Sequence, residues 1–420
     1  MSDAERLACR PIPEHLRLAM SLVALALAMV SAYGFVTFPV YAHGAQEHFG
    51  ITEGRLGLLL SSGAIGSLFS LLLVGPATDR LGSRRMVRAC LAGSGLAYLV
   101  CGIGRSLLSL QIGLILAGFF GAAMAASLPA FLICQYPAWR RRMVTISLVA
   151  IAAPGVIFPL IGQWLLSRVD AGVLGFAPAL HLPFLAAGIV LVGGQFILHL
   201  GRVTDEAGEG PPADFRLRSI LSCSALVIIV CAMLHAGSDN GLYGWLPTFM
   251  ERRFDSLPIG TGLMLGLYSL AYAIARLFLA ALPEGFGQRA FLRLPGPIGG
   301  GLIIAVIWLG GPLAIGVVYP LVGLLVALEF PALLAEIRET TPARFSAIYA
   351  ASIWSGNLLG IANANLIGQI GERTGDLRIG LTLAACGFIG FGVIALVTGM
   401  GRHEAAGADA ASAEQAADAP

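Results

Sequence analysis

The sequence contains no lysine, so all 26 of its basic residues are arginine. Charged residues make up only 12% of the 420-residue chain, which is roughly half the share found in a soluble domain. The formal net charge is +2, and the arginines are scattered along the chain rather than gathered in one segment. Because nucleic-acid binding needs a concentrated basic surface, we expect no nucleic-acid partner.

Motifs for metal, redox and nucleotide chemistry are missing too. The seven cysteines are odd in number, include no CxxC pair and lie mostly within apolar runs, a pattern typical of small core residues rather than disulfides or metal ligands. No GxxxxGK[ST] phosphate-binding loop occurs, which argues against ATP hydrolysis. With no nucleophile–base pair evident either, we expect no enzyme activity, no cofactor and no metal site.

Apolar residues are abundant instead, at 57% of the chain, and the mean hydropathy is +0.82. Runs of about 20 apolar residues are long enough to cross a bilayer as helices. The sequence therefore predicts an all-α polytopic membrane protein embedded in the lipid bilayer. The twelve expected transmembrane helices lie near residues 17–43, 55–78, 84–104, 106–134, 142–167, 181–201, 218–249, 258–282, 290–309, 312–337, 344–370 and 377–400.

The arginines also predict the orientation of these helices. Placing the N-terminus in the cytoplasm assigns 18 arginines to the cytoplasmic side and 7 to the outside, with Arg276 inside a helix. Because positive residues are retained on the cytoplasmic side, we expect both termini there. The first apolar run, residues 18–41, is too long for a signal-peptide core, so we interpret it as a retained membrane span.

The sequence repeats itself between two halves. A charged, glycine-containing turn at residues 75–85 has a weaker copy at 280–289, and further short matches follow in order at offsets of about 202–206 residues. Collinear matches indicate duplication. We expect an N-terminal six-helix bundle over 1–201, a cytoplasmic linker at 202–217, a C-terminal six-helix bundle over 218–400 and a disordered tail at 401–420.

The turn in the first half resembles the loop 2–3 signature of the major facilitator superfamily, G-x-x-x-D-R-x-G-R-[RK], and the resemblance covers essentially the whole chain. Ser83 replaces one basic residue of the signature. The resemblance implies two pseudo-symmetric bundles, alternating access and a monomer, with this loop as a cytoplasmic gate. The matching residues are Gly75, Asp79, Arg80, Gly82, Arg84 and Arg85.

Other signatures of the superfamily indicate which of its branches this chain resembles. Leu114 stands where many proton-coupled drug exporters carry an arginine, and Pro154, Phe158 and Gln163 replace glycines of the antiporter signature. Both departures weaken a drug antiporter interpretation. The segments 243–248 and 33–35 are weakly similar to organic-anion and to monocarboxylate or oxalate/formate carriers, respectively.

Two charged residues lie at bilayer depth, where a charge costs roughly 2.5–3.5 kcal/mol. Glu329 lies two residues before Pro331, which is expected to bend the helix and free a backbone carbonyl. We expect Glu329 either to load a proton or contact the substrate, or to form a structural pair. Arg276 is expected either to pair with Glu329 as part of the structure or to bind an anionic substrate.

Four further residues are candidates for the cavity. Asp239 lies among glycines in the outer half of span 7, with Tyr243 one turn later, and is either a cavity residue or a loop acid. Tyr33 and Thr37 share one face of span 1 and either contact the substrate or pack against span 7.

Together these features predict a proton-coupled secondary transporter of a small organic solute in a bacterial inner membrane. One alternative is a proton-driven efflux pump for drugs or metabolites. A second alternative is a membrane receptor or assembly factor that uses the same scaffold without transport.

Overall fold

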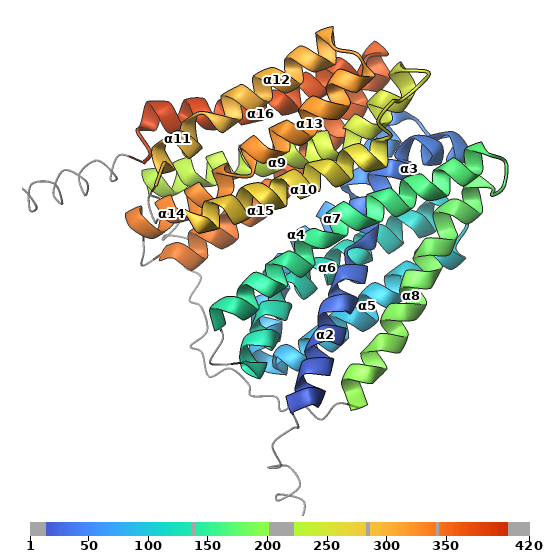
Figure 1. Ribbon diagram of the computed structural model, residues 1–420, viewed down its shortest axis with the longest axis vertical. Coiled ribbons are helices and arrows are strands. Elements are labelled where there is room, and N and C mark those ends of the chain that lie inside the picture. The colour runs from blue at the N-terminus through green and yellow to red at the C-terminus, as the bar shows by residue number, and fades with distance from the viewer. Residues whose placement is uncertain (1–13, 137–139, 201–221, 283–285, 342–343, 402–420) are drawn as a thin grey trace, which may run out of the picture. The chain divides into compact units, whose positions relative to one another are not determined.

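The computed structural model describes residues 14–136, 140–200, 222–282, 286–341 and 344–401, and within them the chain forms helices and no strand (Figure 1). The linker predicted at 202–217 and the tail beyond residue 401 lie outside the described residues. The helices are α2 (Glu14–Ser31), α3 (Tyr33–Phe49), α4 (Glu53–Leu81), α5 (Ser83–Ile103), α6 (Leu107–Gln135), α7 (Arg140–Asp170), α8 (Phe176–Leu200), α9 (Cys223–Arg253), α10 (Thr261–Ala281), α11 (Gln288–Arg293), α12 (Pro295–Leu309), α13 (Pro312–Val326), α14 (Glu329–Thr340), α15 (Phe345–Thr374) and α16 (Leu377–Thr398).

Each of the twelve predicted spans coincides with one helix or with two consecutive helices. Three spans are interrupted, between α2 and α3, between α11 and α12, and between α13 and α14. Among the described residues, ten stretches are long and apolar enough to cross a membrane, and the remaining helices α7 and α15 extend over 31 and 30 residues.

The chain forms two compact units. Unit 1 comprises Met1–Val36, Gly66–Pro154 and Gly175–Ala213, and unit 2 comprises Thr37–Ile65, Gly155–Leu174 and Asp214–Pro420. Two segments of the first half therefore belong to the compact body of the second half. The predicted bundle boundaries at 201 and 218 fall outside the described residues and stay a prediction.

In unit 1, α5 packs against both α6 and α8. Glycines allow the close approach, since a Cβ atom at Gly102 would lie 2.6 Å from the backbone nitrogen of Leu185 in α8. From α5, the Tyr98 hydroxyl donates to the Ser31 carbonyl (2.5 Å) and accepts from the Gly34 amide (2.9 Å). This phenol therefore satisfies backbone groups at the α2–α3 interruption, where the regular helical ladder is broken.

In unit 2, α9 packs against α15 and α16, while α10 packs against α13 and α12 against α16 (Figure 1). Small residues again line the contacts, and a Cβ atom at Gly323 in α13 would lie 2.7 Å from the ring of Tyr268 in α10. The indole of Trp245 in α9 donates to the Ala364 carbonyl in α15 (2.8 Å). These contacts bring polar residues of α9, α10 and α14 into one unit.

Candidate functional site

The site is built around the interruption between α13 and α14. Pro331 has no amide hydrogen, so the carbonyl of Ala327 loses its usual partner four residues later. The chain responds with a tighter turn, in which the Leu328 amide donates to the Leu325 carbonyl (3.2 Å). The helix is therefore interrupted at residues 327–328, one turn before Pro331, and Glu329 becomes the first residue of α14.

Glu329 is fully buried and pairs with His235 of α9. The imidazole Nδ1 lies 2.7 Å from the Glu329 carboxylate, and Nε2 lies 3.2 Å from the hydroxyl of Tyr272 in α10. The side chains are 0% exposed for Glu329 and 4% for His235. Because a buried carboxylate without a partner is strongly unfavourable, the imidazole makes this carboxylate tolerable inside the helix bundle.

The second carboxylate oxygen of Glu329 faces the first turn of α12. A Cβ atom at Gly296 would collide with this oxygen, so the carboxylate lies directly against the backbone there. The first turn of a helix carries free amide groups and a partial positive charge, both of which favour a nearby anion. Glycine at position 296 leaves room for that approach.

Asp239 lies inside a continuous helix and not in a loop, because α9 extends from Cys223 to Arg253. It accepts a hydrogen bond from the hydroxyl of Tyr268 in α10. Tyr268 stacks on Tyr319 of α13 with ring centroids 4.3 Å apart, and lies 6.1 Å from the Tyr243 ring. The candidate residues Asp239 and Tyr243 therefore lie in a cluster with two further tyrosines, and three helices contribute to it.

Arg276 does not form the predicted pair with Glu329, because His235 holds that carboxylate. Its guanidinium lies over the ring of Tyr272, 4.6 Å from the centroid, and the residue is exposed. The cation–π contact uses the face of the guanidinium and leaves N–H donors at its edge. Of the two alternatives for Arg276, the geometry is compatible with a contact to an anionic solute.

Tyr33 and Thr37 are both buried against neighbouring helices. The Tyr33 ring lies 5.2 Å from that of Phe184 and 6.3 Å from that of Tyr98, within unit 1. Thr37 belongs to unit 2, where a Cβ atom at Gly162 of α7 would lie 2.8 Å from its methyl group. These helices, α5 and α8 for Tyr33 and α7 for Thr37, differ from the expected partner, span 7 (α9). Contact of the two side chains with the substrate stays a prediction.

The loop-signature residues mark the junction of α4 and α5 in unit 1. Gly82 separates the two helices with φ of 80°, as expected of a tight turn, and Arg84 donates to the Leu198 carbonyl (3.3 Å). Arg80 and Arg85 are exposed. A Cβ atom at Gly75 would meet nothing within 4 Å among the described residues. The Asp79 side chain lies outside the described residues.

His235 is the residue that sequence reasoning missed. It lies four residues before Asp239, and so on the same helical face. The cost of placing a charge in the bilayer singles out the carboxylates and arginines of the spans, whereas a neutral histidine in an apolar run gives no such signal. The spacing to Asp239 could have drawn attention to it, but its pairing with Glu329, 94 residues away, is a tertiary contact.

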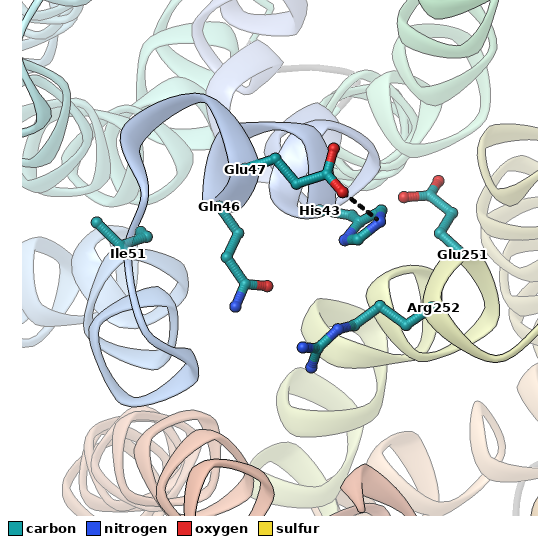
Figure 2. A pocket seen from close by; sticks show the side chains of 6 residues that line it. All are labelled: His43, Gln46, Glu47, Ile51, Glu251 and Arg252. Carbon is teal, nitrogen blue, oxygen red and sulfur yellow. Dashed lines mark ion pairs between the residues drawn. The ribbon is translucent and has the colours of Figure 1, made fainter. Parts of the chain in front are cut away.

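A separate pocket of about 470 Å³ lies in unit 2, between α3 and the end of α9. Figure 2 shows its lining, in which His43 and Glu47 form an ion pair at 3.5 Å across from Arg252. The lining residues are His43, Gln46, Glu47, Ile51, Glu251 and Arg252. No group of three or more possible metal-binding side chains occurs in the described part of the chain.

Comparisons with known proteins identify one family. The sequence matches the model of the Major Facilitator Superfamily over residues 22–362. It is 26% identical to a gallate transporter of Pseudomonas putida over 122 residues, which is 29% of this chain and 25% of that protein. It is 25% identical to the class C tetracycline resistance protein of Escherichia coli over 285 residues, covering 64% of this chain and 66% of that protein.

The fold has solved counterparts as well. A bacterial homolog of the human lysosomal transporter Spinster, crystallised in an inward-facing and unoccupied conformation, superposes with a TM-score of 0.69. The match covers 92% of this chain and 96% of that one at 13% sequence identity. At this identity the similarity concerns the fold alone.

Proposed function

This chain belongs to the Major Facilitator Superfamily, and from that premise we propose that it is a proton-coupled secondary transporter of a small organic solute. Membership makes it a multi-pass membrane protein that moves a solute across a membrane, and not an enzyme. The proposal adds three finer points, which are coupling to protons, an organic anion as the solute, and a bacterial inner membrane as the location.

The buried pair of His235 and Glu329 carries the proton-coupling proposal. A carboxylate and an imidazole 2.7 Å apart can share one proton, and both are titratable groups of the kind that form proton relays inside membrane proteins. The Tyr272 hydroxyl on the other imidazole nitrogen connects the pair to the more exposed Arg276. A proton or a solute arriving near Tyr272 and Arg276 can therefore affect the protonation of Glu329.

An organic anion is proposed because of Arg276. Its exposed guanidinium, held over the Tyr272 ring, offers N–H donors that suit a carboxylate. The partial similarity to a gallate transporter agrees with this class of solute, since gallate carries a carboxylate. Asp239 and Tyr243 supply further polar groups from α9 in the same unit.

The remaining features follow the family architecture. The proposal keeps both termini in the cytoplasm, on the strength of the arginine distribution, and treats the transporter as a monomer. It assigns the cytoplasmic gate to the loop between α4 and α5, with Asp79 at its centre. Alternating access then moves the two halves about one solute site.

Glu329→Gln tests the coupling directly. The amide keeps the size of the side chain but cannot carry a proton, so uptake driven by a pH gradient should fall to the level of empty liposomes. Counterflow exchange of labelled solute needs no net proton movement and should persist. Glu339→Gln, which changes an exposed residue of the same helix, serves as the matched control. Unchanged pH-driven uptake in Glu329→Gln would remove Glu329 from the coupling role.

Efflux of drugs is the second candidate, because the tetracycline resistance proteins align over 64% and 65% of this chain. A thermal-shift screen of the purified protein at pH 5.5 and 7.5 separates the two, since a ligand that binds the folded state raises the melting temperature. Anionic hits that disappear in Arg276→Ala support the organic-anion carrier. Hits confined to cationic or lipophilic drugs would favour efflux instead.

A further inference from the structure

A charged contact closes one end of unit 2. Glu53, the first residue of α4, forms an ion pair with Arg252 near the end of α9. The neighbouring Gly54 amide donates to the carboxylate of Glu372 in α15 (3.0 Å). The beginning of α4 is therefore fastened to the ends of two helices from the second half of the chain.

Below this contact, α4 and α15 touch without a gap. A Cβ atom at Gly57 would lie 2.6 Å from the Ala364 carbonyl oxygen, and the Asn365 amide donates to the Ser61 hydroxyl (3.2 Å). Ser61 is 2% exposed and lies eight residues from Glu53, or about 12 Å along the helix. Nothing can reach Ser61 from the Glu53 end unless the two helices separate.

The contact between α4 and α15 is one seam of this end, and a second seam joins α7 and α10. The Gln163 side-chain oxygen accepts from the Leu263 amide (2.7 Å), and a Cβ atom at Gly266 would lie 3.1 Å from the Val156 carbonyl. Neither seam contains another ion pair among the described residues. The pair of Glu53 and Arg252 is therefore the ion pair, among the described residues, that must break for this end to open.

The surroundings of Arg252 supply a second position for its guanidinium. The Glu53 side chain is 10% exposed, whereas the Arg252 side chain is 36% exposed and lines the pocket of Figure 2. That pocket also contains the carboxylates of Glu47 and Glu251. An arginine that leaves Glu53 can therefore turn into the pocket and meet another carboxylate, which avoids the high cost of leaving a charge unpaired.

We propose that Arg252 is a two-position gate, paired with Glu53 when this end of unit 2 is closed and with the pocket carboxylate of Glu47 when it is open. The inference rests on the proposed function, because alternating access requires this end to open once in each cycle. In the proposed orientation this end faces the outside of the cell.

Chemical labelling of Ser61→Cys tests the gate without any solute. Right-side-out membrane vesicles are treated with a membrane-impermeant sulfonated maleimide, and labelling at residue 61 is followed by peptide mass spectrometry. Glu53→Gln or Arg252→Gln should speed labelling about tenfold, as expected for loss of one charge-assisted hydrogen bond. Glu47→Gln should slow it, because the open position loses its carboxylate. Arg253→Gln, an exposed neighbour, should leave the rate unchanged.

Charge reversal separates a gate from a general loss of stability. The double variant Glu53→Arg with Arg252→Glu recreates the closed pair and should return labelling towards the parent rate. Gly57→Leu offers an independent route, since its side chain should hold α4 away from Ala364 and speed labelling with both charges intact. Labelling at the parent rate in both single glutamine variants would overturn the gate. Faster labelling in Glu47→Gln would overturn the second position.

The outcome does not depend on proton coupling. Labelling requires neither a pH gradient nor a transported solute, so Glu329→Gln in the Ser61→Cys background can still be labelled. If Glu329→Gln keeps its pH-driven uptake while the labelling follows the expected order, the coupling proposal fails and the gate remains.

Discussion

One hydroxyl group supports the first interrupted span. Tyr98 is fully buried and serves as donor to the Ser31 carbonyl and acceptor from the Gly34 amide, both at the α2–α3 interruption. Without the phenol, these two backbone groups would lack a partner in an apolar interior. Leaving buried polar groups unsatisfied is more costly than the net strength of a hydrogen bond suggests.

Tyr98→Phe should therefore destabilise the protein by about 1–3 kcal/mol, measured as a fall in the thermal unfolding temperature in detergent. Tyr319→Phe is the matched control, because Tyr319 is also buried and its hydroxyl has no hydrogen-bond partner within the described part of the chain. The control should be neutral or slightly stabilising. Equal losses in the two variants would show that the hydroxyl at position 98 is not what supports the interruption.

At the same scale, sequence reasoning found half of the central pair. A glutamate in an apolar run is conspicuous because a charge there is costly, so Glu329 could be singled out without a structure. Its partner could not, because the uncharged form of His235 is compatible with an apolar helix and the contact spans 94 residues of sequence. The sequence places Arg276 at a membrane depth similar to that of Glu329, but a shared depth does not determine which side chains face each other.

At the scale of the element, the helices themselves were predictable and their interruptions only in part. All twelve spans are visible as apolar runs, and Pro331 predicts the break before α14. The break between α2 and α3 is different, because Pro39 lies within the uninterrupted α3 and no proline marks the break at Ala32. Prolines inside α6, α8 and α9 also leave those helices continuous. A helix therefore breaks where tertiary contacts, such as those of Tyr98, can satisfy the freed backbone groups.

For the whole molecule, the internal duplication is visible in the backbone. Gly82 follows α4 with φ of 80°, and Gly287 precedes α11 with φ of 70°, at an offset of 205 residues. This offset is within the range predicted from the sequence matches. Both turns keep a glycine with a positive φ, which side chains rarely adopt, although ψ differs, at 152° for Gly82 and 10° for Gly287.

Alanine should therefore be unfavourable at both turns. Gly82→Ala and Gly287→Ala are each expected to cost about 1–3 kcal/mol of stability, the usual penalty for a side chain in a sparsely populated backbone region. Gly301→Ala is the control, because it lies within α12, where a Cβ atom would meet nothing within 4 Å. Thermal unfolding should show the control neutral or more stable. A harmless Gly287→Ala would mean that the second turn no longer depends on its glycine.

The same offsets reveal how far the two copies have diverged. Matching Pro129 with Pro331 aligns Glu329 with Ser127, a buried serine 3.4 Å from the hydroxyl of Thr78. One ancestral position has thus become a neutral hydroxyl in one copy and a carboxylate in the other. Duplication of a gene supplies two equivalent scaffolds, and a single substitution of this kind ends their equivalence. The two copies therefore differ chemically at this position, because a carboxylate can take up and release a proton near neutral pH and a serine hydroxyl cannot.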